Sequence, residues 1–235
     1  MKNRLSGRYF EPTNQSVRWN IQKMKDTFFN LLPEKQNRII SAGFEEFSLH
    51  GYERTSLDSI IRRAGISKGG LYEYIESKED LFVYLVEYAY NELYRSIYTA
   101  ISAKEQQLSS DPLERTKQVS AVAVEFYMTN PELISFIVKA AVTMQNDIRT
   151  CVLEILDRHF LGLYAGCDFS TVQYPEEQIL SLLKWLLLKT RNDFMESVRS
   201  LSRPGLCREA YLDEWAFFLD VLKKGIYTGQ PAGQP

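Results

Sequence analysis

The sequence predicts an all-α protein of about nine helices. Apolar residues recur at helical spacing, as Ile40, Phe44 and Phe47 do, and no segment alternates like a half-buried strand. The dipeptides Asp111-Pro112 and Asn130-Pro131 each pair a capping residue with a proline suited to the first helical position. These features favour an N-terminal unit of three helices followed by a larger bundle of about six.

In the N-terminal unit, cap signals separate the three helices. Residues 34–50 form the first, and Gly51 suits its C-terminus. Ser56 caps a second helix of residues 57–64, and Ser67 caps a third that ends near residue 74. Two short helices joined by a tight turn are typical of a helix-turn-helix.

Capping and breaking residues divide the rest of the chain. Ser77 and Asp80 resemble a capping box that opens a long helix. Residues 166–174 have no apolar period and predict a loop. The further helices are expected at residues 77–103, from residue 112, from residue 131, at 147–164, for about 25 residues from Pro175, and at 206–224.

Four regions are therefore expected along the chain. They are a basic extension (1–33), the helix-turn-helix domain (34–80), the larger bundle (81–228) and a flexible tail (229–235). The net charge of −2 over 235 residues means that any nucleic-acid contact must come from local Lys and Arg side chains.

Cysteine and histidine usage argues against a disulfide framework or a metal site. The three cysteines are an odd number without CxxC spacing, and the two histidines, His50 and His159, lack HxxxH spacing. The N-terminus lacks the apolar segment of a secretory signal, and the longest apolar-rich run, residues 179–188, is too short for a membrane span. A soluble, cytoplasmic protein without a cofactor is expected.

The third helix has an unusual outer face. At 100° per residue, Leu71 and Ile75 share the buried side. The residues expected opposite them and on the flanks are Gly69, Gly70, Tyr72, Glu73 and Tyr74. Each internal glycine costs about 1 kcal/mol relative to alanine, so an adjacent pair makes sense where another molecule approaches closely. A helix with so bare a face could enter the DNA major groove, which is about 12 Å wide.

Further candidates for DNA contact surround this helix. They comprise a hydroxyl beside a cap, two caps at helix N-termini, two outward arginines and two lysines: Thr55, Ser56, Ser67, Arg62, Arg63, Lys68 and Lys78. Hydroxyls and helix N-termini suit phosphate, while an arginine could contact phosphate or guanine. Glu73 could accept from a cytosine amine or be a solvated bystander.

The basic extension carries a net charge of +4 and leaves two interpretations open. Arg4, Arg8 and Arg18 suit a minor-groove or phosphate contact. Packing on the body is about as plausible, given the apolar residues Trp19, Ile21, Met24, Phe28 and Phe29.

These residues resemble the DNA-binding signature of TetR/AcrR-type repressors. The resemblance spans residues 34–80 and rests on Gly51, Tyr52, Thr55, Ser56, Leu57, Ile60, Ala64 to Gly69, Leu71, Tyr72, Tyr74, Ser77 and Lys78. It implies operator contacts, mostly to phosphates, by Thr55, Ser67, Lys68, Gly69, Tyr72, Tyr74 and Lys78. The chain departs from the family pattern at Gly70 and at Glu73. It also departs at Ile75, a position where the family usually has a phenylalanine.

The resemblance also implies that the larger bundle forms a homodimer and holds an effector pocket. Broad apolar faces on the last two helices offer dimer candidates: Leu183, Leu186, Leu187, Phe194, Tyr211, Trp215, Phe218 and Leu222. Pocket candidates on the middle helices, most of which could equally be core, are Tyr94, Tyr98, Phe126, Tyr127, Phe136, Met144, Phe160 and Tyr164. Lys139 and Arg149 are possible polar anchors.

The sequence thus predicts a ligand-responsive transcriptional regulator, in the first place a repressor. It would bind double-stranded palindromic operator DNA as a homodimer and be released by a small apolar or aromatic effector. The long helix from Ser77 would serve as the lever between sensor and DNA. No enzyme activity is expected. Two alternatives stay open: a helical interaction scaffold that reuses the helix-turn-helix, and an all-α enzyme that uses the bundle cavity.

Overall fold

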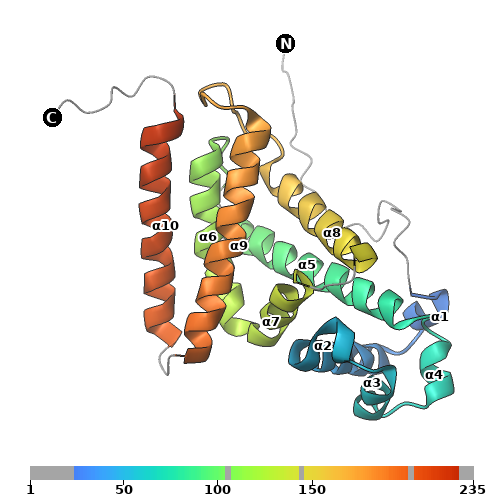
Figure 1. The fold of residues 1–235 in the computed structure, drawn as a ribbon. Helices are drawn as coiled ribbons and strands as arrows, with labels where there is room; N and C mark the ends of the chain where they lie inside the picture. The colour runs from blue at the N-terminus through green and yellow to red at the C-terminus, as the bar shows by residue number, and fades with distance from the viewer. Residues whose placement is uncertain (1–23, 104–106, 143–145, 201–203, 228–235) are drawn as a thin grey trace.

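The computed structural model describes residues 24–103, 107–142, 146–200 and 204–227, and Figure 1 shows their arrangement. The described residues form ten helices: α1 Asp26–Phe29, α2 Pro33–Arg54, α3 Leu57–Ala64, α4 Lys68–Tyr72, α5 Lys78–Ala103, α6 Pro112–Thr129, α7 Pro131–Ala140, α8 Asn146–Tyr164, α9 Glu176–Ser200 and α10 Pro204–Ile226. Their only β feature is an isolated bridge between Val172 and Tyr227. The predicted all-α class is confirmed, and α1 is the helix that the sequence did not indicate.

Local caps set the ends of the short helices. The Ser56 hydroxyl accepts from the Ser59 N–H at the start of α3, and the Ser67 hydroxyl accepts from the Gly70 N–H at the start of α4. Gly65 ends α3 with a φ of 65°, a left-handed conformation that favours glycine. Gly51, with a φ of 73°, interrupts the regular helix within α2. The predicted caps at Ser56 and Ser67 and the predicted breaks at Gly51 and Gly65 are therefore confirmed, whereas Asn130 makes no side-chain cap hydrogen bond at the start of α7.

Residues 24–33 pack on the helix-turn-helix. Met24 and Phe28 are buried, and the Phe28 ring contacts Tyr74 and Tyr84 edge-on. The Gln36 amide nitrogen donates to the carbonyl oxygen of Phe28 at 3.1 Å. For Met24 and Phe28 the packing alternative is therefore correct, whereas Phe29 is 47% exposed. Arg4, Arg8, Arg18, Trp19 and Ile21 lie outside the described residues.

Helix α5 runs from the helix-turn-helix into the bundle (Figure 1). Its 26 residues span about 39 Å. The predicted capping box opens it, because Asp80 Oδ2 accepts from the Ser77 N–H at 2.9 Å and Ser77 Oγ accepts from the Asp80 N–H at 3.1 Å. One end of α5 packs on α2, and the remainder packs on α6, α7 and α8.

Helix α7 joins the bundle to α2 through an aromatic cluster. The Phe136 ring is fully buried, with its centroid 5.0 Å from that of Phe44 and 5.5 Å from that of Phe82. Beside it, Lys139 Nζ donates to the carbonyl oxygens of Ser48 and Leu49. Lys139 therefore fastens α7 to α2, and the expectation that it anchors a ligand is wrong.

Helices α2 and α5 approach closely at Gly43, which leads to a stability prediction. A Cβ atom there would lie 2.5 Å from Cδ1 of Leu85, which is fully buried and has little room to move. We expect Gly43→Ala to lower the free energy of unfolding by about 1–3 kcal/mol through overpacking. Equilibrium denaturation measures this change.

Gly162 provides the control, because a Cβ on this exposed residue of α8 would meet nothing within 4 Å. Gly162→Ala should leave stability unchanged or raise it, since alanine is the better helix former. Equal effects of the two substitutions would contradict the close approach of α2 to α5.

Candidate nucleic-acid interface and bundle cavity

The two glycines of α4 have different surroundings. Gly69 is exposed, and a Cβ built there meets no atom within 4 Å. A Cβ at Gly70 would lie 3.0 Å from the capping hydroxyl of Ser67, so the N-terminal cap itself favours a glycine there. Contacts within the chain therefore account for Gly70, but they give no reason for the missing side chain at Gly69.

The tyrosines beside these glycines do not form a symmetric pair. Tyr72 is 41% exposed, whereas Tyr74 is only 7% exposed and its hydroxyl accepts from Lys35 Nζ at 2.9 Å. The expectation of Tyr74 on a flank of the exposed face is wrong because α4 ends at Tyr72, so helical spacing does not extend to residue 74. Glu73 is exposed, and Ile75 is buried as predicted.

The arginines and lysines of this surface differ in whether they already form ion pairs within the chain. Arg63 pairs with Glu45 and with the buried Glu46, at 2.8 Å in each case. Lys68 pairs with Asp58 at 3.0 Å, and both side chains are well exposed. Arg62 is exposed and makes no side-chain hydrogen bond or ion pair within the described chain. Arg62 is therefore the cation most available to an external anion.

Two candidates for DNA contact instead hold the junction between α2 and α3. Thr55 is 3% exposed, and its hydroxyl lies 2.7 Å from the carbonyl oxygen of Gly51, to which it donates. Lys78 Nζ donates to the carbonyl oxygens of Tyr52 and Thr55 at 2.8 and 3.0 Å, and burial lowers the pKa of Lys78. The expectation that the Thr55 hydroxyl is presented to phosphate is wrong, because it is buried.

The sequence did not indicate what supports the end of α4. Lys25 Nζ donates to the carbonyl oxygen of Tyr72 at 2.9 Å, and the Lys25 N–H donates to that of Tyr74 at 2.8 Å. The Thr27 hydroxyl also donates to the carbonyl oxygen of Glu73. These contacts satisfy backbone acceptors at a helix C-terminus. The weak apolar periodicity of the extension gave no signal of them.

The bundle contains a small, partly open cavity of about 30 Å³ between α5, α6, α8 and α9. Three of the pocket candidates line it: Tyr94, Tyr127 and Phe160. Four do not line it, namely Tyr98, Phe126, Phe136 and Tyr164, and Met144 lies outside the described residues. Phe136 belongs to the cluster at α2, and the Tyr164 hydroxyl lies 2.6 Å from Thr116 Oγ1. The periodicity could not separate cavity lining from core.

A buried cation in this cavity was also not predicted. Arg191 on α9 is 4% exposed and lines the cavity together with Tyr90 of α5. The Nε and Nη2 atoms of Arg191 and the hydroxyl of Tyr90 are buried without a hydrogen-bond partner. The expected polar anchor Arg149 is exposed and does not line the cavity.

The dimer candidates lie on the expected helices, but most of them face inward. Five are buried in the bundle, namely Leu183, Leu186, Phe194, Tyr211 and Trp215, so their placement on a dimer surface is wrong. Leu187, Phe218 and Leu222 are partly buried. Both helices carry a second apolar face, and the first face packs in the chain's own core.

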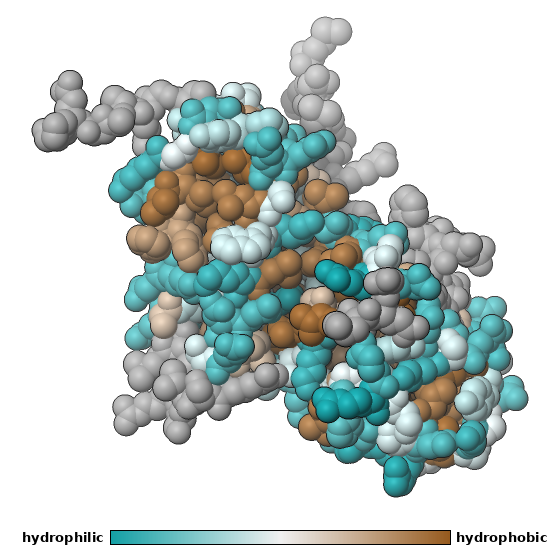
Figure 2. All heavy atoms as spheres, in the orientation of Figure 1, coloured by the Kyte–Doolittle hydropathy of each residue, from teal (hydrophilic) through white to brown (hydrophobic). Residues whose placement is uncertain are grey.

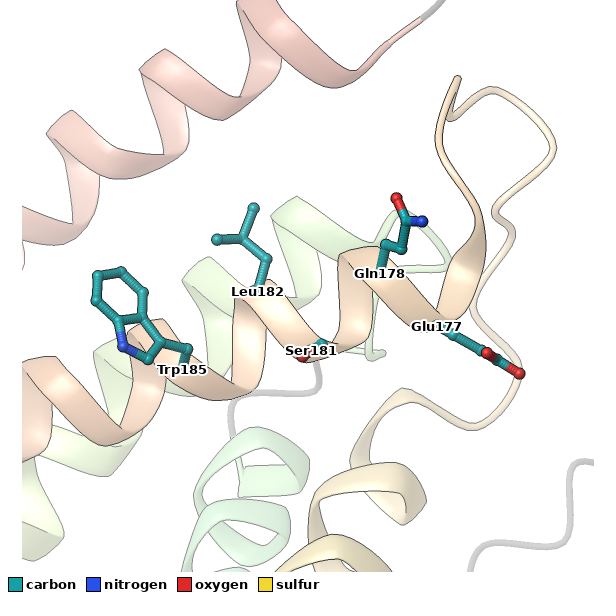
Figure 3. A pocket seen from close by; sticks show the side chains of 5 residues that line it. All are labelled: Glu177, Gln178, Ser181, Leu182 and Trp185. Atoms are coloured by element: carbon teal, nitrogen blue, oxygen red, sulfur yellow. The ribbon is translucent and has the colours of Figure 1, made fainter.

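That second face is exposed on α9 and α10. Trp185 is 57% exposed, Phe217 63% and Val221 50%. Figure 2 shows apolar atoms gathered on this side of the molecule. A shallow groove follows α9. Figure 3 shows Leu182 and Trp185, which line this groove, projecting from α9. The face offers contiguous apolar surface for another protein.

The described part of the chain lacks a single membrane-spanning helix and a metal-binding cluster. No single helix there is long and apolar enough to cross a membrane, and only α6 and α7 together, bent by 108°, meet that criterion. No group of three or more His, Cys, Asp or Glu residues there is placed to hold a metal ion.

Residues 39–85 match the family model described as bacterial regulatory proteins, tetR family. Two curated relatives from Bacillus subtilis are the uncharacterized HTH-type transcriptional regulators YuxN, 35% identical over 66 residues, and YfiR, 25% identical over 105. These matches cover 28% and 41% of this chain, and 23% and 51% of the relatives.

The likeness in fold extends over most of the chain. A crystal structure of a TetR family transcriptional regulator from Chloroflexus aurantiacus superposes with a TM-score of 0.61 and 22% identity. The superposition covers 88% of this chain and 99% of the Chloroflexus aurantiacus chain. The helix-turn-helix and the bundle therefore have the same overall arrangement in the two proteins.

Proposed function

We propose that this chain, whose residues 39–85 match the family model of bacterial regulatory proteins, tetR family, is a ligand-responsive repressor that binds a palindromic operator as a homodimer. The observation that carries the proposal is the open face of α4 at Gly69, where the fold supplies no neighbour. Similar proteins named as transcriptional regulators favour this role over an enzyme. Such a repressor would act in the cytoplasm.

We assign DNA recognition to the surface around Gly69. Arg62 and Lys68 would contact phosphate or base edges, and Tyr72 would lie along one wall of the major groove. Arg63 would contribute less, because its guanidinium is already paired with two carboxylates. Ser56 and Ser67 would act mainly as caps that fix α3 and α4 in this arrangement. Glu73 stays a candidate reader of a cytosine amine.

We assign dimerisation to the exposed apolar face of α9 and α10, represented by Trp185, Phe217 and Val221. Two-fold pairing of this face would bury it and fix the separation of the two recognition helices. Two half-sites about 34 Å apart, one DNA turn, would then both be reached. A palindromic operator follows from the symmetry of the pair.

We assign ligand sensing to the bundle cavity. Its present volume of about 30 Å³ is close to that of one water molecule, whereas ligand sites usually exceed about 300 Å³. A ligand would therefore have to separate α5 from its neighbours in the bundle, and α5 continues into the DNA-binding unit. The ligand can release DNA only if it binds the separated arrangement more tightly than the closed one.

Selection from random DNA tests this proposal without knowledge of the operator. The wild-type protein should enrich inverted repeats, since a dimer presents two identical readers. Trp185→Gln with Phe217→Gln should sediment as a monomer and bind the same repeats more weakly. Leu161→Gln, at a 53% exposed position on α8, is the matched control and should behave as wild type. Absence of any enriched sequence would reject a DNA-binding function.

A further inference from the structure

Arg191 is a charged residue buried inside the bundle. It lies on α9, is 4% exposed and lines the cavity, opposite residues that come from α5, α6 and α8. The walls around it are mostly aromatic and aliphatic, including Leu93, Ile97 and Phe160, and Lys184 is the other charged residue that lines the cavity. An arginine stays protonated in proteins, so the cavity holds a positive charge in an apolar setting.

One edge of the Arg191 guanidinium is unused. Nε and Nη2, which form that edge, are both buried without a hydrogen-bond partner. Their two N–H groups point in parallel, the arrangement that binds both oxygens of a carboxylate. The Tyr90 hydroxyl also lines the cavity and is buried without a hydrogen bond of standard geometry. It interacts electrostatically with Arg191 and supplies a third potential donor to a carboxylate.

Three acidic side chains of the surrounding helices pair with other cations. Glu87 on α5 pairs with Arg158 and contacts His159 on α8. Asp157 on α8 pairs with Lys184, the other cation that lines the cavity, at 2.7 Å. Asp193 on α9 pairs with Lys189. No carboxylate in the described chain forms an ion pair with Arg191, whose buried charge therefore lacks a counterion.

We propose that the effector is an organic monoanion, a carboxylate on an apolar or aromatic body, and that Arg191 and Tyr90 bind its carboxylate. This inference rests on the proposed sensing role of the cavity. The carboxylate accepts from Nε and Nη2 of Arg191 and from the Tyr90 hydroxyl. The apolar body lies among the leucine, isoleucine and phenylalanine side chains, where water would otherwise have to enter.

The same contacts connect the ligand to the DNA-binding unit. Tyr90 lies on α5 and Arg191 on α9, so a carboxylate between them touches both helices. The ligand body needs more room than about 30 Å³ and separates those helices while the carboxylate contacts both. The contacts of Arg191 and Tyr90 thus select a ligand with a carboxylate, and the volume of the ligand body drives the movement of α5.

Thermal shift and isothermal titration of the full-length protein test the proposal. The probes are hexanoate, decanoate and phenylbutanoate, each compared with the primary amide of the same skeleton. We expect at least one carboxylate to bind about tenfold or more tightly than its amide, because charged hydrogen bonds are lost with the amide. Arg191→Met should abolish this preference, and Tyr90→Phe should reduce it.

Lys189→Gln is the matched control, since Lys189 is a cation of the same helix that pairs with Asp193 and Glu214 and does not line the cavity. This variant should keep the preference for carboxylates. Should Arg191→Met fail to fold, Arg191→Lys, which keeps the charge but loses the two-pronged edge, should still weaken carboxylate binding. Equal binding of carboxylates and amides, equal shifts by chloride and decanoate, or an unchanged preference in Arg191→Met would each overturn the proposal.

The proposed function and this inference can fail separately. A carboxylate that binds through Arg191 without releasing selected DNA supports the site and rejects ligand-induced release. An amide or hydrocarbon that releases DNA without a requirement for Arg191 supports ligand-induced release and rejects the anion site.

Discussion

Replacing Phe136 by Ala is expected to lower the free energy of unfolding by about 3–5 kcal/mol, as deletion of a fully buried ring usually does. The ring lies between Phe44 on α2 and Phe82 on α5, and none of its surface is exposed. Neither neighbour can close the space without leaving its own packing. Equilibrium denaturation followed by circular dichroism measures the loss.

Phe136 also joins the DNA-binding unit to the bundle, so its removal should affect cooperativity. We expect the unfolding transition to be broader than that of the wild type or divided in two, because α7 loses an aromatic contact with α2. Leu161→Ala is the control, since this side chain is 53% exposed and its truncation should cost little. A loss in Phe136→Ala no larger than that in the control would show that the cluster does not join the two parts.

The parts of the fold predicted from the sequence are those fixed by local interactions. Ser56, Ser67 and Ser77 each form the cap that their neighbours imply, and the Asp111 carboxylate accepts from the Glu114 N–H at 2.7 Å. These bonds join residues three apart in the chain. Short-range spacing was therefore sufficient to find where those helices begin.

The residues whose burial was predicted wrongly are those whose side-chain direction depends on tertiary contacts. Helical spacing put Tyr74 outside, but α4 is only five residues long, and packing against Phe28 directs Tyr74 inward. Helix α10 has two apolar faces. Trp215 on one face is 1% exposed, whereas Phe217 on the other face is 63% exposed. Amphipathic spacing cannot say which of two apolar faces enters the chain's own core.

Arg191 shows a further limit of patterns. A charged residue in a long helix is ordinarily solvated, so nothing in the sequence set Arg191 apart from the exposed Arg149. Its burial depends on the packing of four helices that are far apart in the chain. Pocket candidates chosen for aromatic character therefore included three lining residues and missed the cation among them.

Gly69→Gln is expected to abolish operator binding while the protein stays folded. Gly69 is exposed in α4 with open space around it, and glutamine is a better helix former than glycine. Within the isolated chain the new side chain has room and carries no charge to repel phosphate. In the complex the glutamine side chain would fill the space that the base edges of the major groove occupy beside α4. Base contacts made by the neighbouring residues would then be lost, each worth about 1–3 kcal/mol. Fluorescence anisotropy with a selected operator measures the affinity.

The most direct test compares Gly69→Gln with Gly162→Gln on the same operator, with thermal unfolding of both variants recorded alongside. Gly162 is also an exposed helical glycine with open space, but it lies on α8, away from α4. We predict that Gly69→Gln binds at least about tenfold more weakly than wild type and melts no lower, whereas Gly162→Gln binds as wild type. Wild-type affinity in Gly69→Gln would contradict the account, because the open face of α4 could not then be the surface that approaches DNA.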